Sequence, residues 1–256
     1  MSRPGNSPAD GKSIGAILRD NLATSGLASD LWLAGHSQVV KSDTYSVAGI
    51  GELAGRACFI KLYRFKSHLR QWLPAWGLRR PRRAYHMAHA LLDAGVDVPR
   101  PLAFVRVAEG AMVVSSALPQ AENLAQCSSQ LTPGEQYQYL AQAGASLGQL
   151  HSSGFSHGDC KWHNLLFSQQ RCYFVDLDGV RRARPGSRQQ AKDFARFAVN
   201  AEEEGVSPEH FAAFVDRYVE NADVPRDRFM HSVRTQARHI RARHRERYGL
   251  LGTQLL

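Results

Sequence analysis

The chain has 256 residues, of which 43% are hydrophobic, a formal net charge of +9 and four cysteines. Its length suits one two-lobed domain or two small ones, and its hydrophobic content supports a packed core and excludes general disorder. No apolar run approaches the roughly 20 residues that span a bilayer, and residues 1–11 show no secretory signal, so an intracellular location is expected. The cysteines form no C-x-x-C pair. This fits a reducing compartment, and neither a disulfide framework nor a zinc site is expected.

The first part of the chain is expected to consist mainly of strands. Residues 1–12 form a polar tail, and the apolar spacing predicts a short helix over Ser13–Ser25. Glycines separate three strand-like runs, a later helix ends before Gly95 as a favourable C-cap, and prolines extend the segment Val96–Pro101. The expected strands are Ser37–Val40, Tyr45–Ile50, Arg56–Tyr63 and a hairpin of Leu102–Val107 with Ala111–Ser115, and the helix is Arg82–Ala94.

After Pro119 the pattern changes to helices. Thr132–Ser152 begins with an N-cap Thr, a Pro at the first helical position and Glu135 at the third, which is the order of a capping box. Two short strands follow, and then three helices. The strands are Leu165–Phe167 and Cys172–Val175, and the helices are Ser187–Asn200, Pro208–Asn221 and Arg226–Tyr248.

These elements predict an α+β fold with two lobes. Residues 1–28 would form an N-terminal tail and short helix, residues 29–117 a strand-rich N-lobe, and residues 118–256 a helical C-lobe that ends in a basic helix. This is the layout of the protein-kinase-like fold.

The most informative stretch runs from His157 to Asn164 and reads His-Gly-Asp-Cys-Lys-Trp-His-Asn. A Lys stands two residues after the Asp and an Asn five residues after it, which is the spacing of a kinase catalytic loop. An apolar strand then leads into Val175-Asp176-Leu177-Asp178. Phosphoryl transfer from ATP uses such a set of carboxylates, cation and amide. Their order therefore predicts an enzyme that transfers a phosphoryl group from ATP and uses Mg²⁺.

Each member of this set has an expected role. Asp159 would orient or deprotonate the attacking hydroxyl, and Lys161 would steady the transferring phosphoryl group by charge attraction. Asn164 and Asp176 would hold Mg²⁺, because a hard cation prefers oxygen ligands. Asp178 could assist Asp176 as a ligand or take its place. Alternatively, Asp178 could pair with one of the arginines that follow it at positions 181 and 182.

A carboxylate on the following helix is expected to support this loop. Asp193 lies on the predicted helix Ser187–Asn200, after the metal-binding stretch. We expect it to brace the loop from below rather than to touch a substrate.

The first lobe is expected to bind the nucleotide. Lys61 stands in an otherwise apolar strand, where its ammonium needs a partner such as the α- and β-phosphates of ATP, unless it lies on the solvent face of an edge strand. Gly49-Ile50-Gly51 is too close to Lys61 to be the usual phosphate loop. The segment Lys41–Ser46 is better placed, and its amides and hydroxyls would cover the phosphates, with Ser42, Thr44 and Ser46 as candidate ligands.

The usual helix carboxylate that pairs with such a lysine is missing. No Asp or Glu occurs between Lys61 and Asp93. Lys61 would then rely on Glu52, on Asp176 or on the nucleotide alone.

Positive charge is concentrated over Lys61–Arg83, where Trp72 and Trp76 are interleaved, and over Arg234–Arg247. Such segments indicate a phosphorylated glycolipid, a membrane surface or a nucleic acid, or simply a solvated surface. The chain carries no recognisable nucleic-acid-binding motif. An anionic membrane surface fits the C-terminal segment equally well, and a nucleic-acid partner is not expected.

Over roughly residues 39 to 200 the chain resembles the lipopolysaccharide core kinases, the Kdo/heptose kinase family of the protein-kinase-like superfamily. The resemblance implies ATP- and Mg²⁺-dependent phosphorylation of a sugar hydroxyl, on heptose or Kdo, in the inner core of lipopolysaccharide. It also implies a cytoplasmic location in a Gram-negative cell, with possible peripheral contact with the inner membrane. The matching stretches are His157-Gly158-Asp159 with Asn164, Val175-Asp176-Leu177-Asp178, Phe59-Ile60-Lys61-Leu62-Tyr63, and Arg82-Arg83-Ala84-Tyr85 through to Gly95-Val96-Asp97-Val98-Pro99-Arg100-Pro101-Leu102.

Two other functions remain open. A kinase of another small molecule or a protein would share the loop, as aminoglycoside phosphotransferases do, but an antibiotic kinase needs an acidic pocket and only Ala201–Glu204 is acidic. A pseudokinase module would explain the missing helix carboxylate. The retention of Asp159, Asn164 and Asp176 argues against it, because a scaffold does not need all three.

Overall fold

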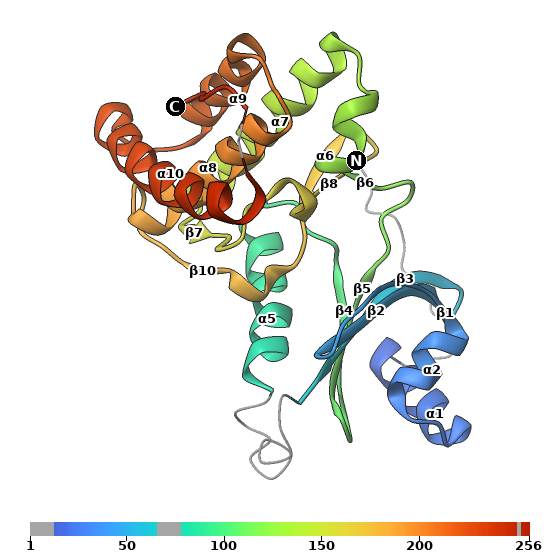
Figure 1. Cartoon of the computed structure of the whole chain (residues 1–256). Helices are drawn as coiled ribbons and strands as arrows, with labels where there is room; N and C mark the ends of the chain where they lie inside the picture. The colour runs from blue at the N-terminus through green and yellow to red at the C-terminus, as the bar shows by residue number, and fades with distance from the viewer. Residues whose placement is uncertain (1–12, 66–77, 250–251) are drawn as a thin grey trace, which may run out of the picture. The chain divides into compact units, whose positions relative to one another are not determined.

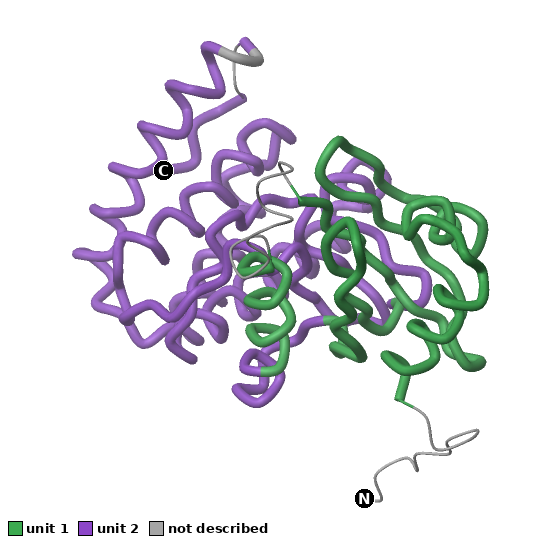
Figure 2. Tube along the Cα trace, turned by 90° about the horizontal axis from the view of Figure 1, so that it is seen from below, with its two compact units in different colours: residues 1–89, 99–117 green, residues 90–98, 118–256 purple. Residues whose placement is uncertain are grey.

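The computed structural model describes residues 13–65, 78–249 and 252–256, and it divides the chain into two compact units. Unit 1 contains residues 1–89 and 99–117, and unit 2 contains residues 90–98 and 118–256 (Figure 2). None of the described helices combines the length and hydrophobicity of a bilayer-spanning segment. The predicted tail at 1–12 and the basic residues Lys66 and Arg70, together with Trp72 and Trp76, lie outside the described residues.

Unit 1 is built on an antiparallel sheet of five strands in the order β1-β2-β3-β5-β4 (Figure 1). The strands are longer than the sequence predicted, and each predicted run lies in one of them except for Tyr45, which directly precedes β2. β3 is hydrogen-bonded to β2 on one side and to β5 on the other. The strands are β1 Ser37–Ser42, β2 Ser46–Leu53, β3 Arg56–Arg64, β4 Pro101–Val107 and β5 Gly110–Ser116.

Two helices cover one face of this sheet and complete its core (Figure 1). α1 (Ile14–Ser25) starts at the N-cap Ser13, as predicted, and its Leu18 is fully buried. α2 (Ser29–His36) was not predicted, because an eight-residue helix depends on packing rather than on propensity. Its Trp32 is buried in the same core. The buried members of this core are Leu18, Trp32, Leu33, Val47, Leu53, Cys58, Ile60, Leu62, Ala103, Val105, Met112 and Val114.

α5 (Arg79–Asp93) begins three residues earlier than predicted and ends close to the predicted residue. Gly95 follows it with φ of +77°, the left-handed conformation that glycine adopts most easily and that ends many helices. The Gly95 carbonyl oxygen accepts a hydrogen bond from Gln149 Nε2 at 2.8 Å, which holds the end of α5 in place within unit 2. Both residues belong to unit 2.

Unit 2 consists of helices and short strand pairs. The predicted capping box of α7 is confirmed, because Thr132 accepts a hydrogen bond from the Glu135 amide while the Glu135 carboxylate accepts one from the Thr132 amide. The helices are α6 Leu124–Cys127, α7 Pro133–Ser152, α8 Arg188–Glu203, α9 Pro208–Asn221 and α10 Arg226–Tyr248, and the strands are β6 Glu122–Asn123, β7 Phe155–Ser156, β8 Leu165–Ser168, β9 Arg171–Phe174 and β10 Arg181–Arg182.

Close helix packing fixes the position of α8 within unit 2. α7 and α9 approach so closely that a Cβ atom on Gly144 would lie 2.2 Å from the Phe214 carbonyl oxygen. Phe194 of α8 packs edge-on to Tyr218 at 4.8 Å between ring centroids, and Phe197 stacks on Phe214 at 4.0 Å. An aromatic cluster of this kind holds a helix rigidly, because every ring is confined by its neighbours. α8 is therefore a firm support for the residues it directs toward the 157–164 loop.

Candidate active site

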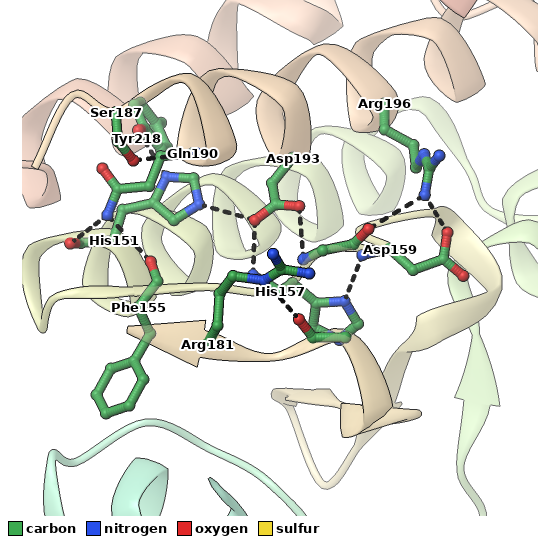
Figure 3. A network of polar contacts seen from close by, with 12 residues as sticks. His151, Phe155, His157, Asp159, Arg181, Ser187, Gln190, Asp193, Arg196 and Tyr218 are labelled. Atoms are coloured by element: carbon green, nitrogen blue, oxygen red, sulfur yellow. Dashed lines mark hydrogen bonds and ion pairs between the residues drawn. The ribbon is translucent and has the colours of Figure 1, made fainter. Parts of the chain in front are cut away.

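The 157–164 loop leaves β7 and ends in the short 3-10 turn Trp162–Asn164, just before β8. Its first two amides donate to one carboxylate, because His157 N lies 2.6 Å from Asp193 Oδ2 and Gly158 N lies 2.8 Å from Asp193 Oδ1 (Figure 3). Asp193 is 1% exposed. The prediction that Asp193 braces the loop is thus confirmed. A buried carboxylate needs such donors, so the loop and α8 stabilise each other.

A buried histidine and tyrosine lie on the other side of Asp193. His151 Nε2 is 3.5 Å from Asp193 Oδ2, and His151 Nδ1 is 2.8 Å from the Tyr218 hydroxyl (Figure 3). Burial lowers the pKa of His151 and raises the pKa of Tyr218. Both groups are therefore neutral near pH 7. A neutral His151 carries one ring proton, and because the Asp193 carboxylate can only accept, we place that proton on Nε2, which faces it. Nδ1 then accepts from the Tyr218 hydroxyl.

The loop approaches another backbone segment at Gly158. This glycine has φ of +84°, and a Cβ atom there would lie 2.7 Å from the Gly179 carbonyl oxygen. Only glycine fits both the left-handed conformation and this close approach. The contact joins the 157–164 loop to the stretch that follows Asp178.

Asp159 is held by three donors, of which Arg196 is drawn in Figure 3. Arg196 of α8 forms an ion pair with its Oδ1, and Lys161 Nζ lies 3.4 Å from its Oδ2. Asn164 Nδ2 donates to the Asp159 carbonyl oxygen at 2.9 Å and to Oδ2 at 3.2 Å. The side chain is still 36% exposed. Two cations fix the direction of the carboxylate, while its exposed part can receive a hydroxyl group.

Arg196 was missed by the sequence analysis. It stands three residues after Asp193 on α8, so both side chains leave the same face of that helix. If Asp193 is known to bind the loop, a basic residue three positions later on the same helix is expected to contact the loop as well. The sequence alone does not select Arg196 over the other arginines of the chain.

The structure brings Asn164 close to the acidic stretch after β9. Val175 N donates to the Asn164 carbonyl oxygen at 3.0 Å, and the His157 ring bonds to the Val175 carbonyl oxygen through Nε2 at 3.0 Å. Asp176 is the next residue and has φ of +57°, an uncommon conformation for a residue other than glycine. Asp178 is buried to 7% exposure in the following 3-10 turn. Because Val175 is hydrogen-bonded to the backbone of Asn164, the next residue, Asp176, lies close to Asn164.

This donor set suits a hard cation. The Asn164 amide nitrogen is occupied by Asp159, which leaves its side-chain oxygen as the group available to a metal ion. Two carboxylates and an amide oxygen match the oxygen ligands of Mg²⁺. Among the described residues no group of three or more His, Cys, Asp or Glu side chains is arranged to hold a metal ion. An ion at this position would therefore also need oxygen atoms from a bound phosphate or water.

Lys61 belongs to unit 1 and lies in the interior of its sheet. It stands opposite Ala48 of β2 and Val113 of β5, so the edge-strand alternative is wrong. Side chains alternate along β3, and Lys61 points away from the face on which Ile60 and Leu62 join the core. Its ammonium lies 4.7 Å from the centroid of the Tyr63 ring.

The register disfavours Glu52 as the partner of Lys61. Glu52 stands opposite Ala57, which is four residues before Lys61 on β3. Four residues along a strand correspond to about 13 Å. The two side chains share a face of the sheet, but they are separated by a distance that neither can easily span.

The turn that was expected to cover phosphates is closed by Asp43. The Asp43 carboxylate accepts hydrogen bonds from the Tyr45 amide at 2.8 Å, the Ser46 amide at 2.8 Å and the Ser46 hydroxyl at 3.0 Å. These donors, chiefly the Tyr45 amide, lower the pKa of Asp43. Ser42 and Thr44 are exposed, whereas Ser46 is buried. The sequence analysis did not identify Asp43, although Asp is a common residue in such turns.

Comparison with known proteins adds a family and a fold to this geometry. The model of the lipopolysaccharide kinase (Kdo/WaaP) family matches residues 32–218. A 3-deoxy-D-manno-octulosonic acid kinase of Vibrio vulnificus strain CMCP6 is 27% identical over 112 residues, which are 42% of this chain and 47% of that protein. The corresponding kinase of Vibrio parahaemolyticus is 25% identical over 164 residues, which are 56% of this chain and 68% of that kinase. The chain thus spans about half the length of most curated relatives it matches.

Two solved structures share the fold. A structure of WaaP in complex with acyl carrier protein gives a TM-score of 0.57 at 19% identity and covers 84% of this chain and 93% of that chain. A spectinomycin phosphotransferase in complex with ADP and spectinomycin gives a TM-score of 0.56 at 14% identity and covers 84% of each chain. The predicted α+β, kinase-like fold is therefore confirmed.

Proposed function

The chain belongs to the lipopolysaccharide kinase (Kdo/WaaP) family, and from this premise we propose that it transfers the γ-phosphoryl group of ATP to a sugar hydroxyl of the lipopolysaccharide inner core, on heptose or Kdo. The observation that carries the proposal is the state of Asp159. Its carboxylate is held in one direction by Arg196 and Lys161, yet part of it remains exposed. A hydroxyl acceptor requires a carboxylate in this state.

In the proposed reaction Asp159 accepts a hydrogen bond from the attacking sugar hydroxyl and orients it. As the oxygen–phosphorus bond forms, the hydroxyl proton passes to Asp159 or to water, and ADP leaves with the electrons of the broken bond. Lys161, at 3.4 Å from Asp159, adds positive charge where the transferring group becomes more anionic. Asn164, Asp176 and Asp178 would hold Mg²⁺, which when bound neutralises part of the phosphate charge.

We assign nucleotide contacts to unit 1. Lys61 would pair with the α- and β-phosphates, and Ser42, Thr44 and Ser46 would lie along the phosphates. Because Asp43 occupies the Ser46 amide and hydroxyl, Ser46 supports this turn and the exposed Ser42 and Thr44 are the better direct contacts. We propose that the two lobes span residues 29–117 and 118–256.

The acceptor is proposed to be lipopolysaccharide core or a related anionic glycolipid, reached from the cytoplasmic side of the inner membrane. One face of α10 supports peripheral contact with an anionic surface. It exposes Arg228, Arg234, Arg238 and Arg245. Arginines on one helix face attract anionic headgroups. Binding to anionic but not to neutral vesicles, with the difference reduced by salt, would support this contact.

The test of the activity is transfer of labelled γ-phosphate from Mg²⁺-ATP to lipopolysaccharide purified from a strain that lacks this gene. We expect label in the lipopolysaccharide with the wild-type protein and none with Asp159→Asn. Asp216→Asn is the matched control, because Asp216 is exposed on α9, away from the 157–164 loop in sequence. No transfer despite measurable ATP binding would favour another acceptor or a pseudokinase.

A further inference from the structure

Four exposed arginines lie within the eight residues 181–188, shortly after Asp176 and Asp178, and we call them the arginine strip. Its members are Arg181, Arg182, Arg184 and Arg188. They run from β10 to the first residue of α8. The roles derived above for the 157–164 loop, for the acidic stretch and for α8 use none of them.

The strip begins beside the 157–164 loop. Strand β10 pairs with β7, which places Arg182 opposite Phe155 and Arg181 opposite Ser156. Ser156 directly precedes His157, the first residue of the loop. The Gly179 carbonyl oxygen accepts from Arg181 Nε at 3.5 Å, and it is also the atom that a Cβ on Gly158 would meet at 2.7 Å. Arg181 is therefore adjacent to the residue that precedes Asp159 (Figure 3).

The backbone of the strip is fixed by hydrogen bonds to buried groups. Ala183 N donates to the Gly154 carbonyl oxygen at 2.9 Å, and Gly186 N donates to Gln190 Oε1 at 2.9 Å. Gln190 is fully buried, and its amide nitrogen donates in turn to the carbonyl oxygens of His151 and Phe155 (Figure 3). A fixed backbone lowers the entropy lost when side chains on it bind a ligand.

The charges of the strip are not compensated by carboxylates. Within the described ranges, none of the four guanidinium groups forms an ion pair with an acidic residue. Arg182 instead lies over the Phe155 ring, 4.2 Å from its centroid. Like charges on neighbouring residues repel each other, so an anionic ligand would relieve the repulsion. Guanidinium groups match the planar geometry of carboxylate and phosphate groups with paired hydrogen bonds.

We propose that the arginine strip binds the carboxylate and phosphate groups of the acceptor, so that a sugar carrying several negative charges presents its hydroxyl to Asp159. Arg181 would contact the anionic group nearest the reacting hydroxyl, and Arg184 and Arg188 would contact groups further along the glycan. This proposal rests on the proposed function and adds the residues that select the acceptor.

The experiment measures binding without chemistry. The probe is a deacylated inner-core oligosaccharide that keeps its phosphates and Kdo carboxylates, titrated against the full chain by calorimetry. The strip variant combines Arg181→Gln, Arg184→Gln and Arg188→Gln. The control variant combines Arg171→Gln, Arg217→Gln and Arg226→Gln at exposed positions outside the strip and outside the α10 face that we assign to the membrane, which removes the same charge from the same unit. Arg182 is left unchanged because it packs on Phe155.

We expect the strip variant to bind the oligosaccharide at least about tenfold more weakly than wild type, since each lost charged hydrogen bond costs binding free energy. The control variant should bind within about twofold of wild type, because exposed charges at a distance are screened by salt. Restoring charge with Arg181→Lys, Arg184→Lys and Arg188→Lys should recover part of the affinity. Both triple variants should bind ATP as wild type does.

Three results would overturn the proposal. They are unchanged binding in the strip variant, equal weakening in both triple variants, and weakening seen only with phosphatidylglycerol vesicles and not with the deacylated oligosaccharide. The last result would assign the strip to lipid headgroups. A failure of the proposed function is distinguished by a different result, namely that the wild-type protein transfers no phosphate to the oligosaccharide that it binds.

Discussion

Arg196 on α8 forms an ion pair with Asp159 on the 157–164 loop, and the same arginine contacts the Gly158 carbonyl oxygen at 3.4 Å. Helix α8 thus contacts the loop twice, through Asp193 at the loop amides and through Arg196 at Asp159. The carboxylate is positioned by a rigid helix and not by the loop alone. A residue that acts in this way should affect the rate of the reaction more than the binding of substrates.

Arg196→Gln tests this positioning role. We expect kcat to fall by about a hundredfold, because a displaced carboxylate no longer aligns the attacking hydroxyl, while KM for ATP stays near the wild-type value. Arg196→Lys should recover part of kcat by restoring the charge. Arg217→Gln on α9 is the control, since Arg217 is exposed and pairs with Glu220 on the helix surface. An Arg196→Gln enzyme with normal kcat would show that Asp159 is positioned without it.

Removing the brace should lower stability as well as activity. In Asp193→Ala the amides of His157 and Gly158 lose their acceptor. We expect the free energy of unfolding to fall by at least about 2 kcal/mol, measured by urea denaturation, because buried donors without partners are costly. Asp216→Ala, at an exposed position, should change it by less than about 0.5 kcal/mol. Equal effects of the two substitutions would contradict the role of Asp193.

The buried His151 should make stability depend on pH. Burial lowers the pKa of His151 from its usual value of 6.5, although Asp193 partly opposes the shift. The unfolded chain therefore takes up a proton at this residue more readily than the folded chain. We expect full stability above about pH 6.5 and a decline as the pH falls below it. His151→Gln should flatten this decline, whereas His239→Gln at an exposed position of α10 should leave it as in wild type.

Gly158→Ala should abolish phosphotransfer. The added Cβ would lie 2.7 Å from the Gly179 carbonyl oxygen in a left-handed conformation, so the loop or the stretch after Asp178 must move. Strain of this kind costs about 1–3 kcal/mol. Gly134→Ala in α7 is the control, because a Cβ there meets no atom within 4 Å. Retained activity in Gly158→Ala would show that this close contact is not needed.

Lys61→Met should weaken ATP binding by about tenfold, because the methionine keeps the length of the side chain and removes the charge that we assign to the phosphates. Glu52→Gln should bind ATP as wild type does, since the strand register keeps Glu52 four residues from the position facing Lys61. Binding of a fluorescent ATP analogue measures both. If Glu52→Gln weakened binding as strongly as Lys61→Met, Glu52 would be the missing partner after all.

Most elements of the fold could be predicted because their signals are local. The α7 helix begins where Thr132, Pro133 and Glu135 predict it, since a capping box involves only neighbouring residues. Strand bounds were predicted too short by one to three residues at several ends, because pairing with a neighbouring strand extends them. α2 was missed, because its stability comes from burying Trp32 in the core of unit 1.

The sequence by itself determined the order and spacing of Asp159, Lys161 and Asn164, which fold into contact because they are only a few residues apart. It also determined the family that this spacing resembles. Only the tertiary structure placed Arg196 against Asp159 and Lys61 inside a sheet rather than at its edge. The physical reason is that these contacts join residues distant in the chain. Helix packing and strand pairing bring them together, and no local preference of the residues themselves encodes them.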